Sequence, residues 1–459
     1  STQAKTLFPY TTLFRSDVSS TGGSELNRAS GLEYVSVTGS AGVVLTLLDN
    51  AVMSAGATID ASGATSGMQL NAAADADGLV ILGTDTVTGD LITLGSGNDS
   101  LFAFGGTDLI IATLGGADSL NLGSGDDTVL FGQALDSQDA VYGGNDIDVL
   151  TYTDVASTGG AEMDQVYDIE RVIASGAVNL TLTDNVFSAA NATVDASGAT
   201  SLTLNANAES SSNLLIIGTA AADSVTLGGG SDVVSLGDSA DYVDAQHASA
   251  DSINLGAGND RVVFGTELSS ADTVDGGDDI DTLVFEGSAS NNTALDNVRN
   301  VEYVSVTGTN VYLTLSNAMV ASADAQLTID ASSAGSLTID GSGVTDTVAS
   351  FYLIGTGGVD LVTLGAANDV ASLGSSNDVV DAHFGGDDSM SLGDGADSVN
   401  FGNAMGAADT VNGDSGTDVL SYNDTSSGAG DELNNVYDVE RVVVTGAVNL
   451  TLTNTVFSA

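Results

Sequence analysis

The chain has 459 residues, of which 62 are acidic and only 7 are basic, so its net charge is −55. This charge makes nucleic acid and anionic membranes poor partners and dissolved cations good ones. Because 42% of the residues are hydrophobic and there is one proline, a packed core is expected rather than disorder. The absence of cysteine excludes disulfides and thiolate metal sites, and the sequence lacks the apolar run of about 18 residues that would predict a transmembrane helix.

The first residues differ from the remainder of the chain. Residues 1–16 contain the only lysine, Lys5, and the only proline, Pro9. Their stretch LFPYTTLFRS resembles the translation of a sequencing-library adapter, so we expect this segment to be non-native. A short targeting segment is the competing interpretation, although neither an apolar core nor a small-residue cleavage site is present. Residues 17–31 align with residues 154–168 and are interpreted as the end of a preceding repeat unit.

From Leu32 onward a unit of about 135 residues recurs. Its copies are predicted at 32–168, 169–300, 301–438 and, shortened, 439–459. No proline-rich or charged linker separates the copies, so one continuous array is expected. Because the repeat is entered and left within a unit, we expect the chain to be an internal fragment of a longer protein.

The first part of each unit contains short β-rich pieces. Examples are NLTLT at 179–183 and SLTLNA at 201–206, where β-branched and apolar residues alternate with polar ones. No window has helical periodicity with caps, so little or no helix is expected. The predicted fold class is all-β, a parallel β-roll or β-solenoid. Independent immunoglobulin-like domains are the alternative for units of this length, but aspartates that recur about every nine residues argue against them.

The second part of each unit, at 83–151, 216–284 and 353–421, contains a series of seven aspartates. Their steps are 9, 9, 10, 9, 12 and 9 in all three copies, and each of the 21 aspartates is followed two positions later by an apolar residue. The apolar residue is predicted to point inward. Two nine-residue turns then form one coil, so aspartates 18–21 residues apart should stack along two edges. In the first copy these are Asp90, Asp108, Asp127 and Asp148 on one edge, and Asp99, Asp118 and Asp139 on the other.

Stacked carboxylates repel one another. At the strand spacing of about 4.8 Å, the repulsion between two neighbouring carboxylates is on the order of 1 kcal/mol in water, and larger at lower dielectric. The 7 basic residues cannot neutralise the series, whereas a hard cation bound by carboxylate and turn carbonyl oxygens can. Calcium suits such a site better than magnesium, since it accepts six to eight oxygens in flexible geometry. The alternative is a ladder of turn-capping aspartates without metal.

Four runs carry a family resemblance: LGSGNDSLF (94–102), GGNDIDVLT (143–151), GGDDIDTLV (276–284) and GDSGTDVLS (413–421). They resemble the GGxGxDxUx nonapeptide of RTX, or haemolysin-type, calcium-binding proteins. The resemblance implies a parallel β-roll with calcium held between neighbouring turns, type I secretion and folding outside the cell. The first part of each unit resembles, more weakly, the β-solenoid stretches of RTX adhesins and bacterial surface-layer proteins.

The predicted cofactor is therefore Ca²⁺, bound at multiple sites. The candidate ligands are Asp99, Asp108, Asp118, Asp127, Asp148, Asp232, Asp241, Asp251, Asp260, Asp281, Asp360, Asp369, Asp378, Asp388, Asp397 and Asp418. Only 10 of the 21 turns keep the family's glycine two residues before the aspartate, where a positive φ is expected. Weak or no binding is predicted at the turns in which another residue replaces this glycine, namely Ala221, Ser239, Ser249, Ser270, Ala367, Ser376 and Ala407. The turns of Asp90, Asp139, Asp223, Asp272 and Asp409 are the least family-like.

Two further sets of residues recur at matching positions. Glu33, Glu170, Glu302 and Glu440 each have an arginine within five residues, which predicts a structural ion pair or an edge cap. His247 and His383 each follow a series aspartate by six or five residues and are predicted to be exposed turn residues. No GxSxG elbow or helical HExxH motif is present, so the chain is not expected to be an enzyme.

These features predict a calcium-binding structural or adhesive region of a secreted bacterial surface protein, from a surface layer, a filament or an adhesin. It would lie outside the cell or at its surface and fold into a rigid rod on binding calcium. Calcium ions are the expected partners, with self-association or cell-surface components as candidates, and no nucleic acid or membrane insertion is expected. The alternative is the calcium-binding β-roll of a larger secreted RTX enzyme or toxin. Ice binding is a third hypothesis, but the sequence has no sustained Thr-x-Thr ladder.

Overall fold

The structure is a computed structural model that describes residues 12–16, 31–40, 42–48, 55–155, 160–247, 249–288, 293–323, 326–424, 430–446, 449–452 and 455–457. It is all-β, with 52% strand and 2% helix, and its parallel sheets form a β-solenoid of about 18 turns. The predicted fold class is confirmed. The chain divides into two compact units, 1–233 and 234–459, which are described separately. Arg28 and most of residues 1–31 lie outside the described part.

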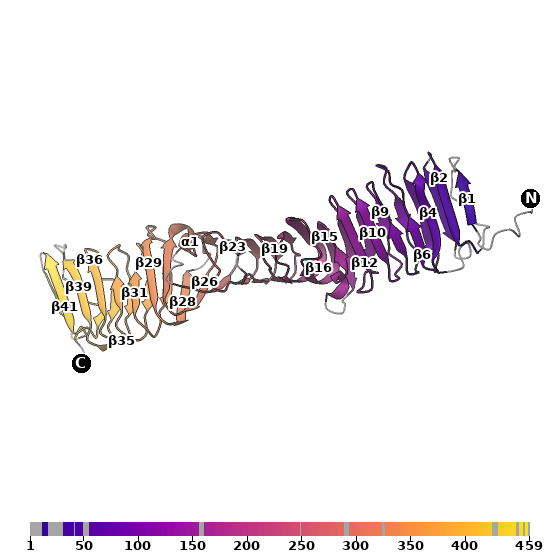
Figure 1. The fold of residues 1–459 in the computed structure, drawn as a ribbon. Coiled ribbons are helices and arrows are strands. Elements are labelled where there is room, and N and C mark those ends of the chain that lie inside the picture. The colour runs from indigo at the N-terminus through magenta and orange to yellow at the C-terminus, as the bar shows by residue number, and fades with distance from the viewer. Residues whose placement is uncertain are drawn as a thin grey trace, which may run out of the picture. The chain divides into compact units, whose positions relative to one another are not determined.

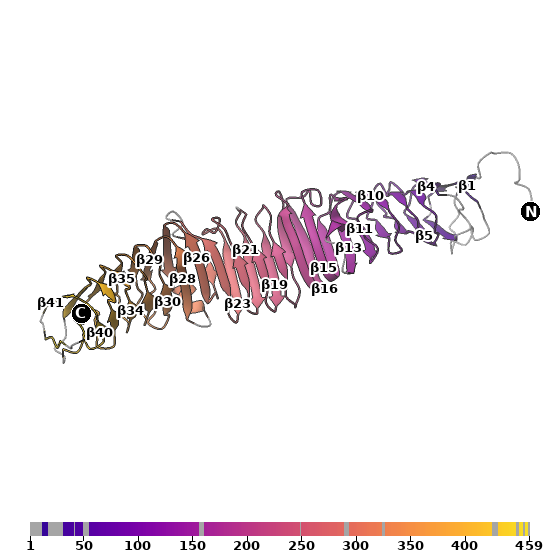
Figure 2. The same ribbon diagram turned by 90° about the horizontal axis from the view of Figure 1, so that it is seen from below.

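Unit 1 contains two columns of parallel strands, in which each strand pairs with the one a coil away (Figure 1). The first column runs β1 (Thr12–Ser16), β2 (Tyr34–Gly39), β4 (Ala57–Ala64), β6 (Leu79–Leu82), β8 (Ser100–Phe102), β10 (Ser119–Ser124), β12 (Ala140–Asn145) and β14 (Val166–Tyr167). The second runs β3 (Val43–Leu48), β5 (Met68–Ala74), β7 (Leu91–Thr93), β9 (Leu109–Ile111), β11 (Thr128–Gly132), β13 (Val149–Val155), β15 (Arg171–Thr183) and β16 (Asn191–Ala208). The long strands β15 and β16 lie side by side (Figure 2), and β16 pairs with both β17 (Asn213–Ile217) and β18 (Ser224–Thr226).

Unit 2 repeats this arrangement, with β19 (Val233–Asp238) at its start. One column runs β20 (Tyr242–Asp244), β22 (Arg261–Val263), β24 (Thr282–Glu286), β26 (Tyr303–Gly308), β28 (Leu327–Ala334), β30 (Phe351–Ile354), β32 (Val370–Ser372), β34 (Ser389–Ser391), β37 (Thr410–Asn412) and β40 (Val436–Tyr437). Three further strands pair in the order β21 (Ser252–Ala257), β23 (Thr273–Asp278) and β25 (Val298–Arg299). The third sheet runs β27 (Val311–Ser316), β29 (Leu337–Gly343), β31 (Asp360–Thr363), β33 (Val379–Asp381), β36 (Ser398–Gly402), β39 (Val419–Asp424) and β41 (Arg441–Gly446), and the short β35 (Asp394–Gly395) pairs with β38 (Ser415–Gly416).

Helix is confined to two short pieces in the described residues. A 3-10 turn, η1, covers Ala161–Met163, and α1 covers Asn317–Ser322 with the Ser316 hydroxyl accepting the Met319 amide as its N-cap. The predicted scarcity of helix is therefore confirmed. Neither piece is long enough to cross a lipid bilayer.

The core of each unit is built from the apolar residue two positions after each series aspartate. All 21 of these side chains, from Ile92 to Leu420, are at most 3% exposed. The prediction that they point inward is confirmed. Because the strands have a two-residue alternation, burying this residue also places the aspartate on the inward side of the strand's start.

Glycine is required at the turns for two physical reasons. A positive φ occurs at the predicted glycine of seven turns: Gly106, Gly116, Gly125, Gly230, Gly258, Gly386 and Gly416. At Gly97, Gly358 and Gly395 the reason is space, since a Cβ would lie 2.2, 2.0 and 1.9 Å from the nearest backbone carbonyl oxygen of the preceding coil. Ser239 and Ser376 occupy the same turn position at φ 77° and 88°, a conformation that disfavours any side chain with a Cβ.

Candidate metal centre

Buried columns of aspartates run along unit 1. In each column the backbone amide of one aspartate donates a hydrogen bond to the side chain of the aspartate one coil later, and this link is called a step. The amide of Asp90 donates to Oδ1 of Asp108 (2.6 Å), that of Asp108 to Asp127 (2.7 Å) and that of Asp127 to Asp148 (3.0 Å). On the other edge, Asp99 donates to Asp118 (2.9 Å) and Asp118 to Asp139 (2.8 Å). The two predicted stacks therefore exist, with the predicted members.

Unit 2 has the same columns. Their steps are Asp241 to Asp260 (2.7 Å), Asp260 to Asp281 (2.8 Å), Asp251 to Asp272 (2.9 Å), Asp360 to Asp378 (2.8 Å), Asp378 to Asp397 (2.7 Å), Asp397 to Asp418 (2.9 Å), Asp369 to Asp388 (3.0 Å) and Asp388 to Asp409 (2.8 Å). Where a column starts, an ordinary strand amide is the donor, as Leu337 is to Oδ1 of Asp360 at 3.0 Å. One carboxylate oxygen of each step is thus used to join coils.

Every series aspartate is buried, at most 3% exposed. At the series aspartates whose pKa is raised, such as Asp99, Asp118 and Asp127, burial is the largest cause, and the charge of neighbouring aspartates raises the pKa of many of them further, against the lowering effect of the amide hydrogen bonds. The pKa rises to about 6 at Asp99, Asp108, Asp369 and Asp418, to about 7 at Asp118, Asp148, Asp281 and Asp378, and to about 8 at Asp127 and Asp388. The columns are therefore strained electrostatically when no cation is bound.

The second carboxylate oxygen, Oδ2, accepts no hydrogen bond at many of the column aspartates. At ten aspartates Oδ2 is buried and has no hydrogen-bond partner: Asp99, Asp108, Asp127, Asp148, Asp260, Asp281, Asp378, Asp388, Asp397 and Asp418. Buried carboxylate oxygens without a donor are costly, so each one fits a cation ligand. All ten belong to the predicted ligand set.

The five least family-like turns differ from these ten in the hydrogen bonding of Oδ2. Their Oδ2 accepts an amide of the aspartate's own turn: Thr84 to Asp90, Asp136 to Asp139, Thr219 to Asp223, Ser269 to Asp272 and Gly406 to Asp409, all at 2.7 to 2.8 Å. Two predicted ligands share this arrangement, since Asp360 accepts the Thr356 amide and Asp369 the Gly365 amide. Asp251 accepts the hydroxyl of Ser249 instead. Local turn geometry therefore divides the columns into satisfied and unsatisfied carboxylates.

The first glycine of the GGxGxD runs keeps space beside the unsatisfied oxygen. A Cβ on Gly143 would lie 2.6 Å from Oδ2 of Asp148, and one on Gly276 would lie 2.5 Å from Oδ2 of Asp281. In the part of the chain that the structure describes, no three Asp, Glu or His side chains converge on one point. A calcium ion would thus be held by carboxylates of successive coils together with turn carbonyls, an all-oxygen donor set of the kind it prefers. When bound, it supplies positive charge between carboxylates that otherwise repel.

The recurring glutamates end the columns. Oε2 of Glu170 accepts the Asp148 amide (2.8 Å), Glu302 accepts that of Asp281 (2.8 Å) and Glu440 accepts that of Asp418 (2.7 Å). Of the two predicted roles, the edge cap is the one observed. The arginines pair elsewhere: Arg171 with Asp195 at 2.7 Å and Arg299 with Asp275 at 2.8 Å.

These glutamates were missed as members of the carboxylate columns. Their spacing was the available signal, because Glu170 follows Asp148 by 22 residues, close to the coil length.

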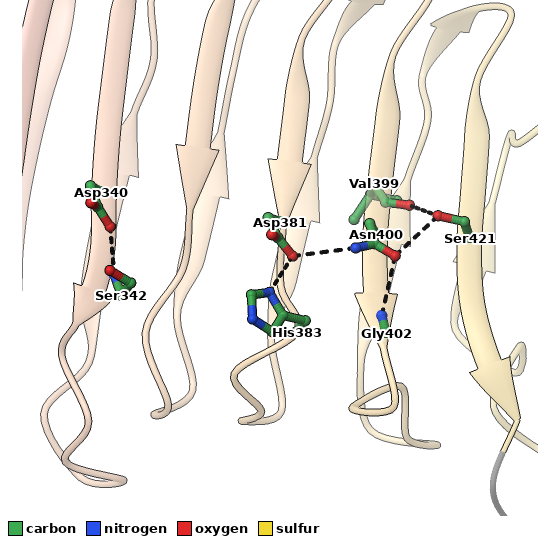
Figure 3. A network of polar contacts seen from close by, with 8 residues as sticks. All are labelled: Asp340, Ser342, Asp381, His383, Val399, Asn400, Gly402 and Ser421. Atoms are coloured by element: carbon green, nitrogen blue, oxygen red, sulfur yellow. Dashed lines mark hydrogen bonds and ion pairs between the residues drawn. The ribbon is translucent and has the colours of Figure 1, made fainter.

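The outer face of unit 2 carries a separate polar network (Figure 3). Nδ1 of His383 lies 2.6 Å from Oδ1 of Asp381, and the Asn400 amide reaches the same oxygen at 3.5 Å. Ser421 completes the network by donating to Oδ1 of Asn400 at 3.3 Å. The imidazole of His383 is exposed, as predicted, and its partners are ordinary surface groups. The same prediction is wrong for His247, which is half-buried.

The fold and the columns define the class of protein: a parallel β-solenoid whose coils are joined through stacked buried carboxylates. A family model supplies the particular repeat. The RTX calcium-binding nonapeptide repeat matches four times, at residues 86–115, 215–245, 247–266 and 354–387, roughly a quarter of the chain. The chain therefore carries RTX repeats, as the sequence motifs indicated, and these repeats are structural calcium-binding elements rather than catalytic ones. Comparisons with curated proteins and with solved structures found no match.

Proposed function

We propose that this chain is a calcium-binding structural or adhesive region of a secreted bacterial surface protein, which folds into a rigid rod when it meets extracellular calcium. The observation that carries the proposal is the set of ten buried Oδ2 atoms without a hydrogen-bond partner, arranged coil after coil within the columns. A charge of −55 favours the unfolded chain until cations are bound.

The physical mechanism is coupled binding and folding. The columns exist only in the folded state, so calcium binds the folded chain and adds its binding free energy to stability. At low calcium the self-repelling columns favour an extended chain that can be exported. At millimolar calcium the same columns become cross-links between coils.

Circular dichroism of the purified chain, titrated with calcium and then with EGTA, tests the proposal. We expect a parallel-β spectrum in calcium that is lost on chelation and returns on adding calcium again. Magnesium at the same concentration is the matched control and should restore less of the spectrum, because it demands near-octahedral geometry and releases water reluctantly. A β spectrum that is indifferent to EGTA would overturn the proposal.

A surface or adhesive role is separable from that of a tail on a larger secreted enzyme or toxin. A structural rod should bind cells or its own copies in calcium, which pull-down on bacterial cells and light scattering can measure. A chain that stays monomeric and binds no surface in calcium would favour the enzyme or toxin context.

A further inference from the structure

A groove of about 410 Å³ lies on the outer face of unit 2, on the sheet that contains β27, β29, β31 and β33. One row of its side chains is apolar. Leu361 and Val379 are paired residues of the neighbouring strands β31 and β33, and they are 46% and 44% exposed. Phe384, which follows β33 and is 40% exposed, adds an aromatic ring to the lining. Large apolar side chains that stay exposed in one groove indicate a binding surface.

A second row in the same groove carries two carboxylates. Asp340 on β29 pairs with Thr363, and Thr363 pairs with Asp381 on β33, so the two acids lie on one face, two strands apart (Figure 3). At a strand spacing of about 4.8 Å, their positions are about 10 Å apart. Oδ1 of Asp340 accepts the Ser342 amide at 3.0 Å, and Nδ1 of His383 lies 2.6 Å from Oδ1 of Asp381. These contacts fix each carboxylate through Oδ1 and leave Oδ2 for a ligand.

The charge and the spacing of the two acids restrict the ligand. None of the residues that line the groove is a lysine or an arginine, so the two carboxylates make it an acidic site that favours a cation. One calcium ion cannot join them, because its ligand oxygens must lie about 2.5 Å from the ion and the acids are about 10 Å apart. The groove therefore suits an organic ligand with two separated positive charges.

The apolar row indicates what joins those two charges. Leu361 and Val379 lie two residues before Thr363 and Asp381 on their strands, so the apolar row runs beside the row of acids. An alkyl chain between two ammonium groups would remove both apolar side chains from water, which is favourable. A volume of about 410 Å³ is that of a small-molecule site.

We propose that this groove binds a linear aliphatic polyamine. One ammonium group contacts Oδ2 of Asp340, another contacts Oδ2 of Asp381, and the alkyl chain lies over Leu361 and Val379. His383 is a positioning residue, since it holds the Asp381 carboxylate through Oδ1. The site is separate from the aspartate columns, whose carboxylates are buried inside the coils.

Unit 1 contains the same place without the carboxylates. There the row that corresponds to the acids is Asn71, Thr93 and Ile111, whose residues pair strand by strand. Leu91 and Leu109 form the apolar pair beside them. The proposal therefore predicts one polyamine site in the chain, in unit 2.

Isothermal titration calorimetry with spermidine tests the proposal on the full chain. Saturating calcium and physiological salt reduce diffuse attraction to the other carboxylates. We expect one saturable spermidine site. Replacing both acids, Asp340→Asn with Asp381→Asn, should weaken it about tenfold, because two exposed ion pairs are lost. Leu361→Ser keeps both charges and should weaken it about fivefold through the lost apolar contact.

The matched control removes the same charge elsewhere in unit 2. Asp296 and Asp346 are exposed and do not line the groove, so Asp296→Asn with Asp346→Asn should leave the affinity unchanged. Circular dichroism in calcium should give the wild-type spectrum for every variant, since none of the replaced side chains belongs to the core. Putrescine, a shorter diamine that cannot reach both acids, should bind the wild-type chain about tenfold more weakly, and this comparison needs no variant.

Three results would overturn the proposal. Equal losses of affinity in the groove pair and the control pair would show diffuse binding to an acidic surface. Equal affinity for putrescine and spermidine, or no effect of Leu361→Ser, would show that the groove does not read the alkyl chain. A lysine-rich peptide or a neutral oligosaccharide that needs the groove acids and binds more tightly than spermidine would assign the groove to that ligand instead.

Discussion

The amide nitrogen of Asp281 donates a 2.8 Å hydrogen bond to Oε2 of Glu302, and this contact ends an aspartate column. Every earlier step of that column uses an aspartate, whose shorter side chain suits the tight nine-residue turn. Glu302 lies where the β-roll turns give way to the longer strand β26, and the added methylene lets its carboxylate reach back to the last turn. The glutamate also places one more negative charge beside Asp281, which contributes to the raised pKa of Asp281 of about 7.

Removing this cap should destabilise the chain. Glu302→Ala leaves the Asp281 amide without its acceptor in a buried place, at a cost of about 1–3 kcal/mol. Glu302→Gln keeps an acceptor oxygen and should cost less than the alanine variant. Urea unfolding in calcium measures both, and equal losses for the two variants would mean that the hydrogen bond is not the source of the effect.

Neutralising one unsatisfied carboxylate should have opposite effects with and without calcium. Asp127→Asn keeps Oδ1 as the acceptor for Asp108 but removes a buried carboxylate whose pKa is raised to about 8. In EGTA the variant should gain about 1–3 kcal/mol or show more β structure, since the buried charge is gone. In calcium it should lose stability, because a ligand is missing.

Asp139→Asn is the matched control for that experiment. Both Asp139 oxygens already accept amides, from Asp118 and Asp136, so the new NH₂ group faces a donor. We expect loss of stability in either condition. If Asp127→Asn behaved like Asp139→Asn, the division of the columns by their second oxygen would be wrong.

The pH dependence should also reverse between the two conditions. Folded-state pKa values of about 6 to 8 lie above the ordinary aspartate value of 3.8, so the metal-free fold gains stability from protons. That stability is fully present below about pH 4 and is lost as pH rises through 6 to 8. In EGTA, circular dichroism should therefore show more β structure at pH 5 than at pH 8.5. In calcium the midpoint calcium concentration should rise as pH falls, because the ligands must be deprotonated.

Relieving strain at one turn should stabilise unit 2. Ser376 has φ 88°, which costs a residue with a Cβ about 1–2 kcal/mol. Ser376→Gly should raise the unfolding free energy by about 1 kcal/mol, reduced by loss of the exposed hydroxyl bond to the Gly357 carbonyl at 3.0 Å. Ser376→Ala loses the same hydroxyl but keeps the Cβ, so thermal melts should separate the two variants. Equal melting temperatures would show that φ is not the limiting factor.

The amino-acid sequence by itself determined the coil and what points into it. The steps of 9, 9, 10, 9, 12 and 9 set the coil length, and the apolar residue after each aspartate set the register, because a strand has only two sides. The membership of both stacks in unit 1 follows from these two features alone. The glycine pattern matches the use of the second carboxylate oxygen only in part, since Asp223 and Asp409 lack the glycine and have a satisfied Oδ2, whereas Asp378 lacks it and does not.

Only the tertiary structure decided how each carboxylate is used. Whether Oδ2 of Asp360 meets the Thr356 amide, or that of Asp378 meets nothing, depends on a difference in turn path that composition does not show. The same holds for Glu302, which accepts an amide a coil away while Arg299 pairs with Asp275, and for Tyr152, whose pKa is raised in part by the charge of Glu162 from η1. The periodicity of the sequence determines on which side of a strand a side chain lies. Hydrogen bonds and cation sites depend on atomic positions to within about an ångström, and only the packing of successive coils sets those positions.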